Sequence, residues 1–382
     1  MSTAQHAGAR VPIAVLLGGP SAEHDVSIVS GNAVADALES NGHPVRRILI
    51  DLGGAWWWLP AGHRRDDRPT AAYHEPAALD ADGPFSAGTA VDRLAGGSSP
   101  TTDRDALVVF IALHGPFGED GTVQAMLESA GLAYTGSGVT ASAIGMDKAI
   151  FKRLVRGLGL PVVDWREIHA GRWAREPDAV LGELEAFAAA TGEQRLMVKP
   201  ARLGSSVGMT LAHGPDDRAA ALDMAFRYDT LALAERYLQG ARDLEVSVIG
   251  NDRLEQYGPG EIVSGHEFYD YAAKYTPGLS ESSLRAEVPA ALRATILKYA
   301  RDAYRAIGAE GFARVDFLLA GSTLVVSEIN TIPGFTPISL FPALPAEGGL
   351  DFAAVCERVV DLARERHAAR ARAALTAADL PR

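Results

Sequence analysis

The chain has 382 residues, of which 47% are hydrophobic and 22% are charged, and its formal net charge is −12. This length is too great for one ordinary core and predicts two or three packed domains, while the composition is typical of a globular protein rather than a disordered or fibrous one. The acidic balance argues against non-specific nucleic-acid binding, and no apolar run approaches the roughly 20 residues that a membrane span needs.

Cysteine usage and the first residues indicate a cytoplasmic setting. Cys356 is the single cysteine, which excludes an intrachain disulfide, and its Ala-rich surroundings favour a packed core thiol over a nucleophile. The stretch MSTAQHAGAR at 1–10 has no apolar region behind its charges. The apolar run at 11–17 ends in two glycines, which predicts a buried strand and a turn rather than a signal peptide.

The N-terminal segment predicts a strand–helix–strand unit. The strand at 11–17 is followed by a GGPS turn, a helix, and a second strand at 45–50. This order is typical of a doubly wound α/β domain, in which ligands bind beyond the carboxyl ends of the strands. Glu23 stands at that edge. Helix capping accounts for Ser21, whereas Glu23 has either a ligand role or a dipole role worth only ~0.3–1 kcal/mol.

Residues 56–130 contain one segment of biased composition and one further strand. Residues 60–104 are rich in Asp, Arg, Gly, Pro and Ser and are interpreted as a surface insertion of little functional content. Three consecutive tryptophans at 56–58 cannot share one face of a strand, so at least one is expected to be exposed or packed at an edge. A buried strand at 106–113 ends at His114, before a glycine-rich loop and a helix at about 122–130. His114 fits a ligand site and a structurally satisfied histidine equally well.

A Gly/Ser loop between two strands is a candidate for phosphate binding. The sequence KPARLGSSVG connects a strand at 195–199 to another at 209–212. Small residues there let backbone N–H groups converge on an anion, although the Gly-Lys-Ser/Thr ending and the following helix of a Walker A loop are absent. An unliganded hairpin turn is the alternative. Lys199, and Lys148 at the start of an upstream helix, favour phosphate.

The remaining chain predicts a third unit, reached through a connector at 235–238. Its expected elements are strands at 244–249, 312–319 and 323–329 and a helix at about 289–307. The tail from about 363 alternates Arg, Glu and Ala and is interpreted as a solvated helix.

Four polar residues in this unit predict a magnesium site. Arg314 and Asp316 are two apart, as are Glu328 and Asn330, so each pair shares one face of its strand. A three-residue loop at 321–323 would set Asp316 directly opposite Glu328 in a hairpin. Carboxylate and amide oxygens suit Mg²⁺, which proteins hold through one or two carboxylates and substrate phosphates. The alternative is a solvated sheet face with ion pairs, which four such residues beside apolar runs disfavour.

A possible lid precedes these strands. The sequence HEFYDYAAKY at 266–275 contains three Tyr and one Lys without clean periodicity. It predicts a segment that closes over a site and excludes water, and an irregular loop anchored by aromatic packing is the alternative.

Seven stretches of the chain form one collinear set. They are GGPSAEHDVSIVSG at 18–31, ALHGPFGEDGT at 112–122, YTGSGVTASAIGMDK at 134–148, VKPARLGSSVGM at 198–209, HEFYDYAAKY at 266–275, GFARVDFLL at 311–319 and EINTIPGFTPISL at 328–340. In this order they closely resemble the D-alanine–D-alanine ligase family, and they span nearly the whole chain apart from 60–104 and the tail.

The resemblance implies a chain of the α/β and α+β classes with the ATP-grasp fold, in which two α+β domains hold the nucleotide between them. A doubly wound, Rossmann-like preATP-grasp domain would come first. The implied domains are 1–136, 137–235 and 236–382. The implied activity is ATP-dependent joining of two D-alanine molecules through a D-alanyl phosphate, for peptidoglycan synthesis. Two Mg²⁺ or Mn²⁺ ions and a cytoplasmic homodimer are also implied, with no nucleic-acid or membrane partner.

The matched motifs imply roles around the nucleotide. The phosphates would be held by Lys148, Lys199, Ser205 and Ser206. The adenine would be bordered by Glu235, Arg236 and Leu238, and the ribose by Glu245. The two metal ions would be bound by Asp316, Glu328 and Asn330.

The same motifs imply roles around the amino acids. Glu23 would take the ammonium of the first D-alanine, with His114 nearby. The second D-alanine would be surrounded by Lys274, Ser339 and Leu340. Arg314 and the backbone N–H of Gly334 would form the oxyanion site.

Tyr275 bears on the second substrate. In dipeptide-forming members a Tyr at this place links to residues matching Ser205 and Glu23 and ties the lid down, which favours D-alanine over D-lactate here. D-alanine–D-lactate and D-alanine–D-serine ligases are the nearest alternatives. A non-catalytic ATP-binding regulator is more distant, because nucleotide binding alone would not need Arg314. The sequence departs from the family pattern at Arg236, Ala272, Leu203 and Pro337.

Overall fold

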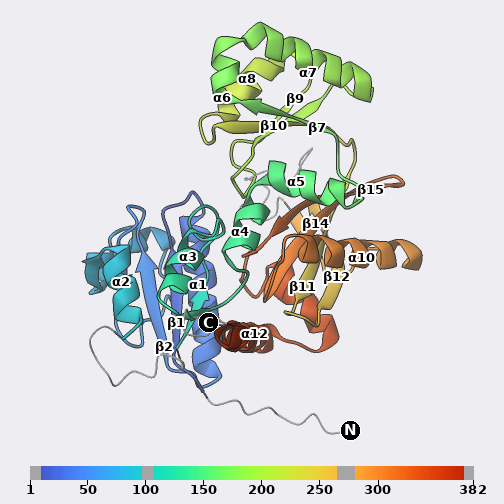
Figure 1. Ribbon diagram of the computed structural model, residues 1–382. Coiled ribbons are helices and arrows are strands. Elements are labelled where there is room, and N and C mark those ends of the chain that lie inside the picture. Colours follow the sequence, from blue (N-terminus) through green and yellow to red (C-terminus); the bar gives the residue numbers. More distant parts are fainter. Residues whose placement is uncertain (1–9, 97–106, 265–279, 374–382) are drawn as a thin grey trace, which may run out of the picture.

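Three β-sheets form the framework of the molecule, and the computed structural model describes residues 10–96, 107–264 and 280–373 (Figure 1). The first sheet has the order β4-β3-β2-β1-β5-β6. Its strands are β1 (Ile13–Gly18), β2 (Val45–Ile50), β3 (Trp56–Trp58), β4 (Asp82–Phe85), β5 (Val108–Ile111) and β6 (Ala133–Tyr134). The helical segments of this part are α1 (His24–Ser40), η1 (Thr70–His74), η2 (Pro76–Leu79), α2 (Ala87–Leu94) and α3 (Thr122–Ser129).

The expected strand–helix–strand unit is confirmed. β1 pairs in parallel with β2 on one side and with β5 on the other, and every residue of β1 is buried. A parallel strand covered on both faces requires a continuous apolar run, which explains why IAVLLG does not alternate with polar residues. α1 packs closely against β1 at Gly31, where any Cβ would stand only 2.5 Å from the Cβ of Leu17.

The interpretation of 60–104 as a surface insertion is wrong for its described part. β4 extends the sheet by pairing with β3, and the Tyr73 side chain in η1 is fully buried. Ala90 and Val91 of α2 are also buried. Charged and small residues dominate the composition of 60–104, and this composition did not indicate that a few of its side chains are buried. Among the tryptophans, Trp56 and Trp58 are buried, and Trp57 is the partly exposed one, as the alternation of a strand requires.

The second sheet is antiparallel, with the order β7-β10-β8-β9. Its strands are β7 (Trp165–His169), β8 (Leu196–Pro200), β9 (Thr210–Ala212) and β10 (Leu231–Arg236). It is covered by α6 (Ala170–Arg175), α7 (Pro177–Thr191) and α8 (Pro215–Ala225), which lie together at the top of Figure 1. The apolar faces of these helices and strands form a separate core.

The third sheet is also antiparallel, with the order β13-β12-β11-β14-β15. Its strands are β11 (Arg242–Ile249), β12 (Glu255–Ser264), β13 (Ser280–Ser283), β14 (Phe312–Ala320) and β15 (Thr323–Asn330). The helical segments around it are α4 (Val139–Met146), α5 (Lys148–Gly157), α10 (Ala290–Ala306), α11 (Leu340–Ala343), η3 (Leu344–Gly348) and α12 (Phe352–Ala373). Phe151 and Val155 of α5 share the core of this third sheet. The division into 1–136, 137–235 and 236–382 stays a prediction.

The hairpin of β14 and β15 has the expected pairing but a different turn. Ala320 pairs with Thr323, so the turn has two residues rather than three. A register shift between Asp316 and Phe317 then moves Asp316 opposite Glu328. The third residue that was expected in the loop lies instead in a bulge of β15. A two-residue turn followed by this bulge gives the same register beyond the bulge as a three-residue turn would.

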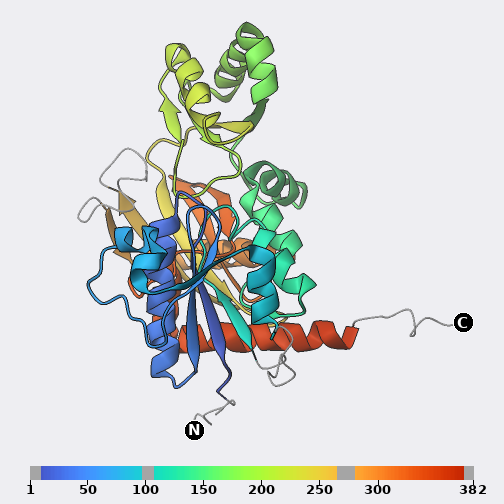
Figure 2. The ribbon, with the colours of Figure 1, turned by 90° about the vertical axis from the view of Figure 1, so that its left-hand side faces the viewer.

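The helix predicted over the tail from about 363 is confirmed as the last turns of α12, and residues 368–372 are exposed, as expected for a solvated helix. Ala363 and Arg366 are buried exceptions. Figure 2 shows α12 lying across the ends of the strands of the first sheet, and its buried residues include Cys356, as expected for a core thiol. Arg366 is 5% exposed and donates hydrogen bonds to the carbonyl oxygens of Tyr134, at 2.9 Å, and Gly136. The buried residues of α12 join the first sheet to the third, and the alternation of Arg, Glu and Ala did not indicate these contacts.

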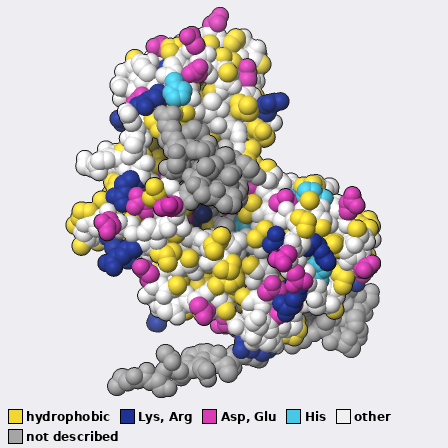
Figure 3. All heavy atoms as spheres, turned by 180° about the vertical axis from the view of Figure 1, so that it is seen from behind, with side chains coloured by type: hydrophobic (Ala, Val, Ile, Leu, Met, Phe, Trp, Pro, Cys, Tyr) yellow, Lys and Arg dark blue, Asp and Glu magenta, His cyan; other side chains and the backbone are white. Residues whose placement is uncertain are grey.

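The surface of the described residues agrees with the mixed composition. On the face seen in Figure 3, Lys and Arg side chains are interspersed with Asp and Glu side chains. Among the helices of residues 10–96, 107–264 and 280–373, none combines the length and the apolar character needed to cross a bilayer.

We expect Arg366→Ala to lower the free energy of unfolding by about 2–4 kcal/mol, because two buried carbonyl oxygens lose a charged donor. Arg364→Ala on the same helix is the control, since the Arg364 side chain is 40% exposed, and a change within about 0.5 kcal/mol is expected there. Urea unfolding of both variants measures this. Equal losses would show that Arg366 does not fasten the helix.

Candidate active site

Residues predicted to bind nucleotide or metal ions, together with the predicted oxyanion residue Arg314, meet in one cleft between the second and third sheets. Nine of them line it: Lys199, Ser206, Glu235, Arg236, Leu238, Glu245, Arg314, Asp316 and Glu328. Lys148 and Asn330 lie beside Glu328 in an adjoining pocket. Strands from two sheets, the Gly/Ser loop and the first turn of α5 therefore bring together side chains that are distant in the sequence, from Lys148 to Asn330.

An acidic face with one arginine forms the floor of the cleft on β14 and β15. Arg314 donates from Nε and Nη2 to the two carboxylate oxygens of Asp316, both at 2.7 Å, and its Nε lies 3.4 Å from Glu245 Oε1. Asn330 donates to Asp316 Oδ2 at 2.9 Å. Although burial disfavours its charge, Asp316 and Glu245 raise the pKa of Arg314 well above its usual value.

The donor set on this face fits a hard cation. Asp316 and Glu328 are direct neighbours across the two strands, and Asn330 touches Asp316. Their side chains offer carboxylate and amide oxygens but no sulfur or imidazole ligand, which is the chemistry that Mg²⁺ prefers. Both carboxylates remain partly exposed, at 17% and 22%, so they are open to the cleft.

Lysines face the acidic floor from α5 and β8. Lys199 Nζ and Lys152 Nζ each lie 3.0 Å from a carboxylate oxygen of Glu235. Although burial opposes ionisation, these two lysines hold the pKa of Glu235 below its usual value, while burial lowers the pKa of Lys152. Two lysines on one carboxylate leave a net positive charge at this end of the cleft, which suits an anion.

Lys148 links the first turn of α5 to the Gly/Ser loop and to the acidic face. Its Nζ donates to the carbonyl oxygen of Leu203 at 2.8 Å and lies 3.2 Å from Glu328 Oε2. Although burial disfavours its charge, Glu328 raises the pKa of Lys148. The helix places it there because Asp147 caps the first turn by accepting from the N–H groups of Ala149 and Ile150.

The Gly/Ser loop is held in an unusual backbone conformation. Ser205 and Ser206 have φ of +50° and +56°, in the left-handed region that non-glycine residues rarely adopt. Such conformations cost on the order of 1–3 kcal/mol each and concentrate at functional sites. This strain favours the phosphate interpretation over an unliganded hairpin turn.

Glu23 reaches this loop from the turn between β1 and α1. It is 7% exposed, and its Oε1 accepts a hydrogen bond from the Ser205 hydroxyl. Its Oε2 is buried without a hydrogen-bond donor among the described residues. A Cβ at Gly115 would stand 2.4 Å from this oxygen and a Cβ at Gly204 2.8 Å, so two glycines let the carboxylate enter. Glu23 is also the residue before α1, and its side chain makes no capping bond.

His114 has the contacts of a structurally satisfied histidine. Its Nδ1 donates to the carbonyl oxygen of Ile332 at 2.9 Å, and its Nε2 lies 2.8 Å from the Ser30 hydroxyl. Burial lowers its pKa, which keeps the ring neutral. Both ring nitrogens therefore have partners, Nδ1 in the segment that follows β15 and Nε2 on α1, and the contact with substrate stays a prediction.

Glu119 is a residue of this site that the motifs left without a role. It accepts hydrogen bonds from the N–H groups of Gly115, at 2.8 Å, and Ile332, at 3.0 Å. Burial, together with the nearby Glu23, raises the pKa of Glu119 to about 8. The signal in the sequence was a carboxylate inside a glycine-rich loop. The two N–H groups that Glu119 accepts from belong to residues more than 200 positions apart in the chain.

Two further residues of the site were missed. Asp243 lines the cleft two residues before Glu245 on β11 and therefore on the same face of that strand. Lys152 lies one helical turn after Lys148 on α5, a spacing that would have revealed it. Lys274 and Tyr275, with the whole predicted lid at 266–275, lie outside the described residues.

The loop after β15 brings Gly334 beside Ser339. A Cβ at Gly334 would stand 3.3 Å from Ser339 Oγ. That hydroxyl accepts from the Thr336 N–H at 3.2 Å and lies 2.8 Å from Thr336 Oγ1. Leu340 begins α11 and is 5% exposed. Gly334, predicted for the oxyanion site, thus lies beside Ser339, predicted to contact the second D-alanine.

Comparison with known families gives matches over most of the chain. The family model described as D-ala D-ala ligase N-terminus matches residues 12–137, and the one described as D-ala D-ala ligase C-terminus matches residues 154–361. A D-alanine–D-alanine ligase of Heliobacterium modesticaldum is 39% identical over 366 residues, covering 93% of this chain and 95% of the relative. One of Kineococcus radiotolerans is 38% identical over 369 residues, covering 93% and 96%.

Solved structures give the same result. The D-alanine-D-alanine ligase from Coxiella burnetii has a TM-score of 0.74 and 27% identity, covering 95% of this chain and 98% of that one. The VanG D-Ala:D-Ser ligase from Enterococcus faecalis has a TM-score of 0.77 and 30% identity, covering 93% and 99%.

We expect Lys152→Met to lower the free energy of unfolding by about 3 kcal/mol, which is the lower end of the usual cost of breaking a buried ion pair. The lower end applies because Lys199 still contacts Glu235. Arg153→Met on the same helix is the control, since that side chain is 59% exposed and its ion pair with Glu167 spans 3.6 Å. Urea unfolding distinguishes the two. A Lys152 variant as stable as the Arg153 variant would contradict the expectation.

Proposed function

The chain belongs to the D-alanine–D-alanine ligase family and is an ATP-dependent ligase with the ATP-grasp fold, and we propose that it joins two D-alanine molecules through a D-alanyl phosphate. The observation that carries the proposal is the face of β14 and β15, where Arg314, Asp316, Glu328 and Asn330 meet the lysines of the cleft. Supply of D-alanyl-D-alanine for peptidoglycan synthesis follows from this activity.

The chemistry explains why these residue types are needed. A carboxylate is a poor electrophile, so an oxygen of the first D-alanine attacks the γ-phosphorus of ATP, and ADP leaves. The amine of the second D-alanine then attacks the acyl carbon and loses a proton, and phosphate leaves from the tetrahedral intermediate. The first step gathers negative charge, and the second develops it on one oxygen, so the two steps need separate sets of donors.

We assign the phosphate contacts to Lys148, Lys199 and the loop at Ser205 and Ser206. Support comes from the positive charge around Glu235 and from the strained backbone of the two serines. Glu235, Arg236 and Leu238 would border the adenine, and Glu235 would also orient the two lysines. Glu245 would contact the ribose. Asp243 lies on the same face of β11 and would be a second carboxylate near the ribose.

We assign a magnesium pair to Asp316, Glu328 and Asn330. The support is the shared face and the hard oxygen donors. Bound there, Mg²⁺ would neutralise charge on the transferring phosphoryl group and its oxygens.

We assign the ammonium of the first D-alanine to Glu23. Its buried Oε2, with no donor among the described residues, suits an ammonium group, while Ser205 holds the other oxygen. Burial of an unpaired carboxylate oxygen is costly, which gives a positively charged substrate group a favourable place to bind.

The oxyanion would be held by Arg314 and the Gly334 N–H, and the second D-alanine by Ser339, Leu340 and Lys274. Tyr275 would complete the site from the lid, in contact with Ser205 and Glu23. D-serine is the alternative second substrate, favoured by the similarity to the D-Ala:D-Ser ligase structure. We also propose a cytoplasmic homodimer, as the family resemblance implies.

The first test offers D-alanine, D-serine and D-lactate together with ATP and MgCl₂, and identifies the products by mass spectrometry. We expect D-alanyl-D-alanine as the main product and phosphate release that depends on D-alanine. A depsipeptide or D-alanyl-D-serine as the main product would replace the proposed acceptor. Phosphate release that is independent of D-alanine would overturn the proposal.

The second test replaces Arg314 with alanine. Loss of one oxyanion donor typically lowers kcat about 10²–10³-fold, so we expect that loss with ATP affinity nearly unchanged. Arg242→Ala is the matched control, because Arg242 makes a comparable pair with Glu261 in the same sheet, at 2.7 and 2.6 Å. Turnover by Arg314→Ala equal to that of the control would contradict the oxyanion role.

A further inference from the structure

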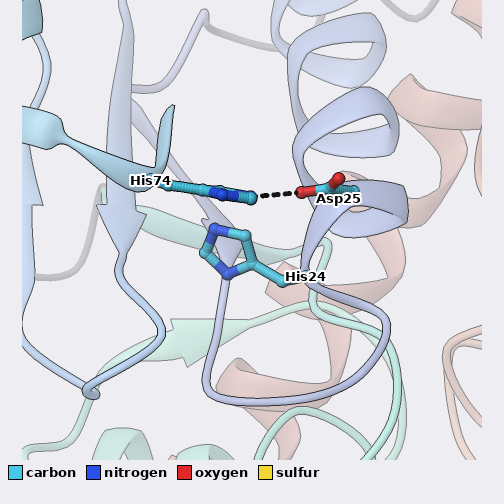
Figure 4. Close-up of side chains that lie close together, drawn as sticks. All are labelled: His24, Asp25 and His74. Carbon is cyan, nitrogen blue, oxygen red and sulfur yellow. Dashed lines mark hydrogen bonds and ion pairs between the residues drawn. The ribbon is translucent and has the colours of Figure 1, made fainter. Parts of the chain in front are cut away.

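Two histidines and an aspartate meet beside the first domain's helix α1, outside the nucleotide cleft. His24 and Asp25 form the first turn of α1, and His74 ends the short helix η1 (Figure 4). One ligand atom from each of the three side chains can be chosen so that all lie within 4.8 Å of one another. Residues 60–104 were expected to have little functional content, yet they supply one of the three.

His24 is the residue that makes this cluster unusual. It is 3% exposed, and its Nδ1 lies 2.7 Å from the carbonyl oxygen of Gly19. A carbonyl oxygen only accepts, so Nδ1 carries the hydrogen and Nε2 presents a lone pair. Nε2 is buried and has no hydrogen-bond partner among the described residues, although an unpaired buried polar atom is costly. Figure 4 shows the ring turned toward His74.

Asp25 and His74 face this nitrogen from the solvent side. Asp25 Oδ1 lies 2.8 Å from His74 Nε2, and Asp25 Oδ2 accepts from the Thr70 hydroxyl at 2.9 Å. The rings of His24 and His74 are 5.4 Å apart between centroids. The Asp25 and His74 side chains are 51% and 39% exposed, so an ion can reach them from solvent.

We propose that His24 Nε2, His74 and Asp25 form a binding site for one divalent transition-metal ion of the Zn²⁺ class. Two imidazole nitrogens and one carboxylate, with water as a fourth ligand, are a common zinc set, and imidazole selects transition metals over Mg²⁺. Ion binding at His74 Nε2 would replace its hydrogen bond with Asp25.

The contacts around the three ligands have the form of an outer ligand shell. A metal-bound histidine usually donates its other ring N–H to a backbone carbonyl or a carboxylate, which fixes its tautomer, and His24 does this with Gly19. Thr70 holds the far oxygen of Asp25 in the same way.

A metal ion here would fasten η1 to the start of α1. The three ligands come from two segments that are about fifty residues apart, and His24 follows Glu23 directly in the chain. An ion that binds the folded chain and not the unfolded one raises the melting temperature by mass action. The site would therefore stabilise the segment that carries Glu23, whatever reaction that residue serves.

The test is zinc binding by the full chain after chelator treatment, measured by titration calorimetry and by metal analysis after dialysis. Excess MgCl₂ and an ATP analogue are present, so that the carboxylates of the cleft do not take up zinc. We expect one Zn²⁺ per chain and a rise in melting temperature. Loss of even an outer ligand partner costs ~10–100-fold in affinity, so His74→Ala and Asp25→Asn are each expected to lose at least that much.

The matched control is His169→Ala, which replaces an exposed histidine at the end of β7, just before α6. His74 and Asp25 are both partly exposed, so their replacement leaves the core intact, and circular dichroism checks that the variants are folded. Retained affinity in the control with loss in both variants supports the site. No zinc on the wild-type chain, equal affinity in all four proteins, or a loss shared by His169→Ala would overturn it.

Discussion

The strand pairing that sets Asp316 opposite Glu328 is the constraint on which the rest of the site depends. Two carboxylates on one partly buried sheet face repel each other unless cations lie nearby. The fold supplies Arg314 on the same strand, Lys148 from the start of α5, and Lys199 from the facing sheet. The cleft is therefore a place where negative and positive side chains alternate over short distances, which suits a triphosphate with its magnesium.

The site is completed by hydrogen bonds between parts of the chain that are distant in sequence. Ser205 of the second sheet's loop bonds Glu23 of the first domain. His114 and Glu119 both bond the backbone of Ile332, just after β15. Because each of these bonds joins segments next to two different sheets, a shift of one sheet would move Glu23, the Gly/Ser loop or the segment after β15 together with it. We infer that the cleft works as one unit for this reason.

Local patterns predicted the elements of the site, and long-range contacts decided the rest. The two-residue periodicity of a strand placed Arg314 beside Asp316, and the collinear motifs placed the lysines and the serine loop. The bulge that sets the register of β15 has no local signature, so the turn was assigned one residue too many. The burial of Arg366 depends on carbonyl oxygens more than 200 residues away, which composition does not reveal.

The most direct test of the central claim is a crystal structure with a non-hydrolysable ATP analogue and Mg²⁺. The account predicts that Asp316, Glu328 and Asn330 coordinate the metal ions, and that Lys148 and Lys199 contact the phosphates. If the three oxygen ligands pointed away from metal and triphosphate, or the nucleotide bound elsewhere, the assignment of this cleft as the catalytic centre would be contradicted.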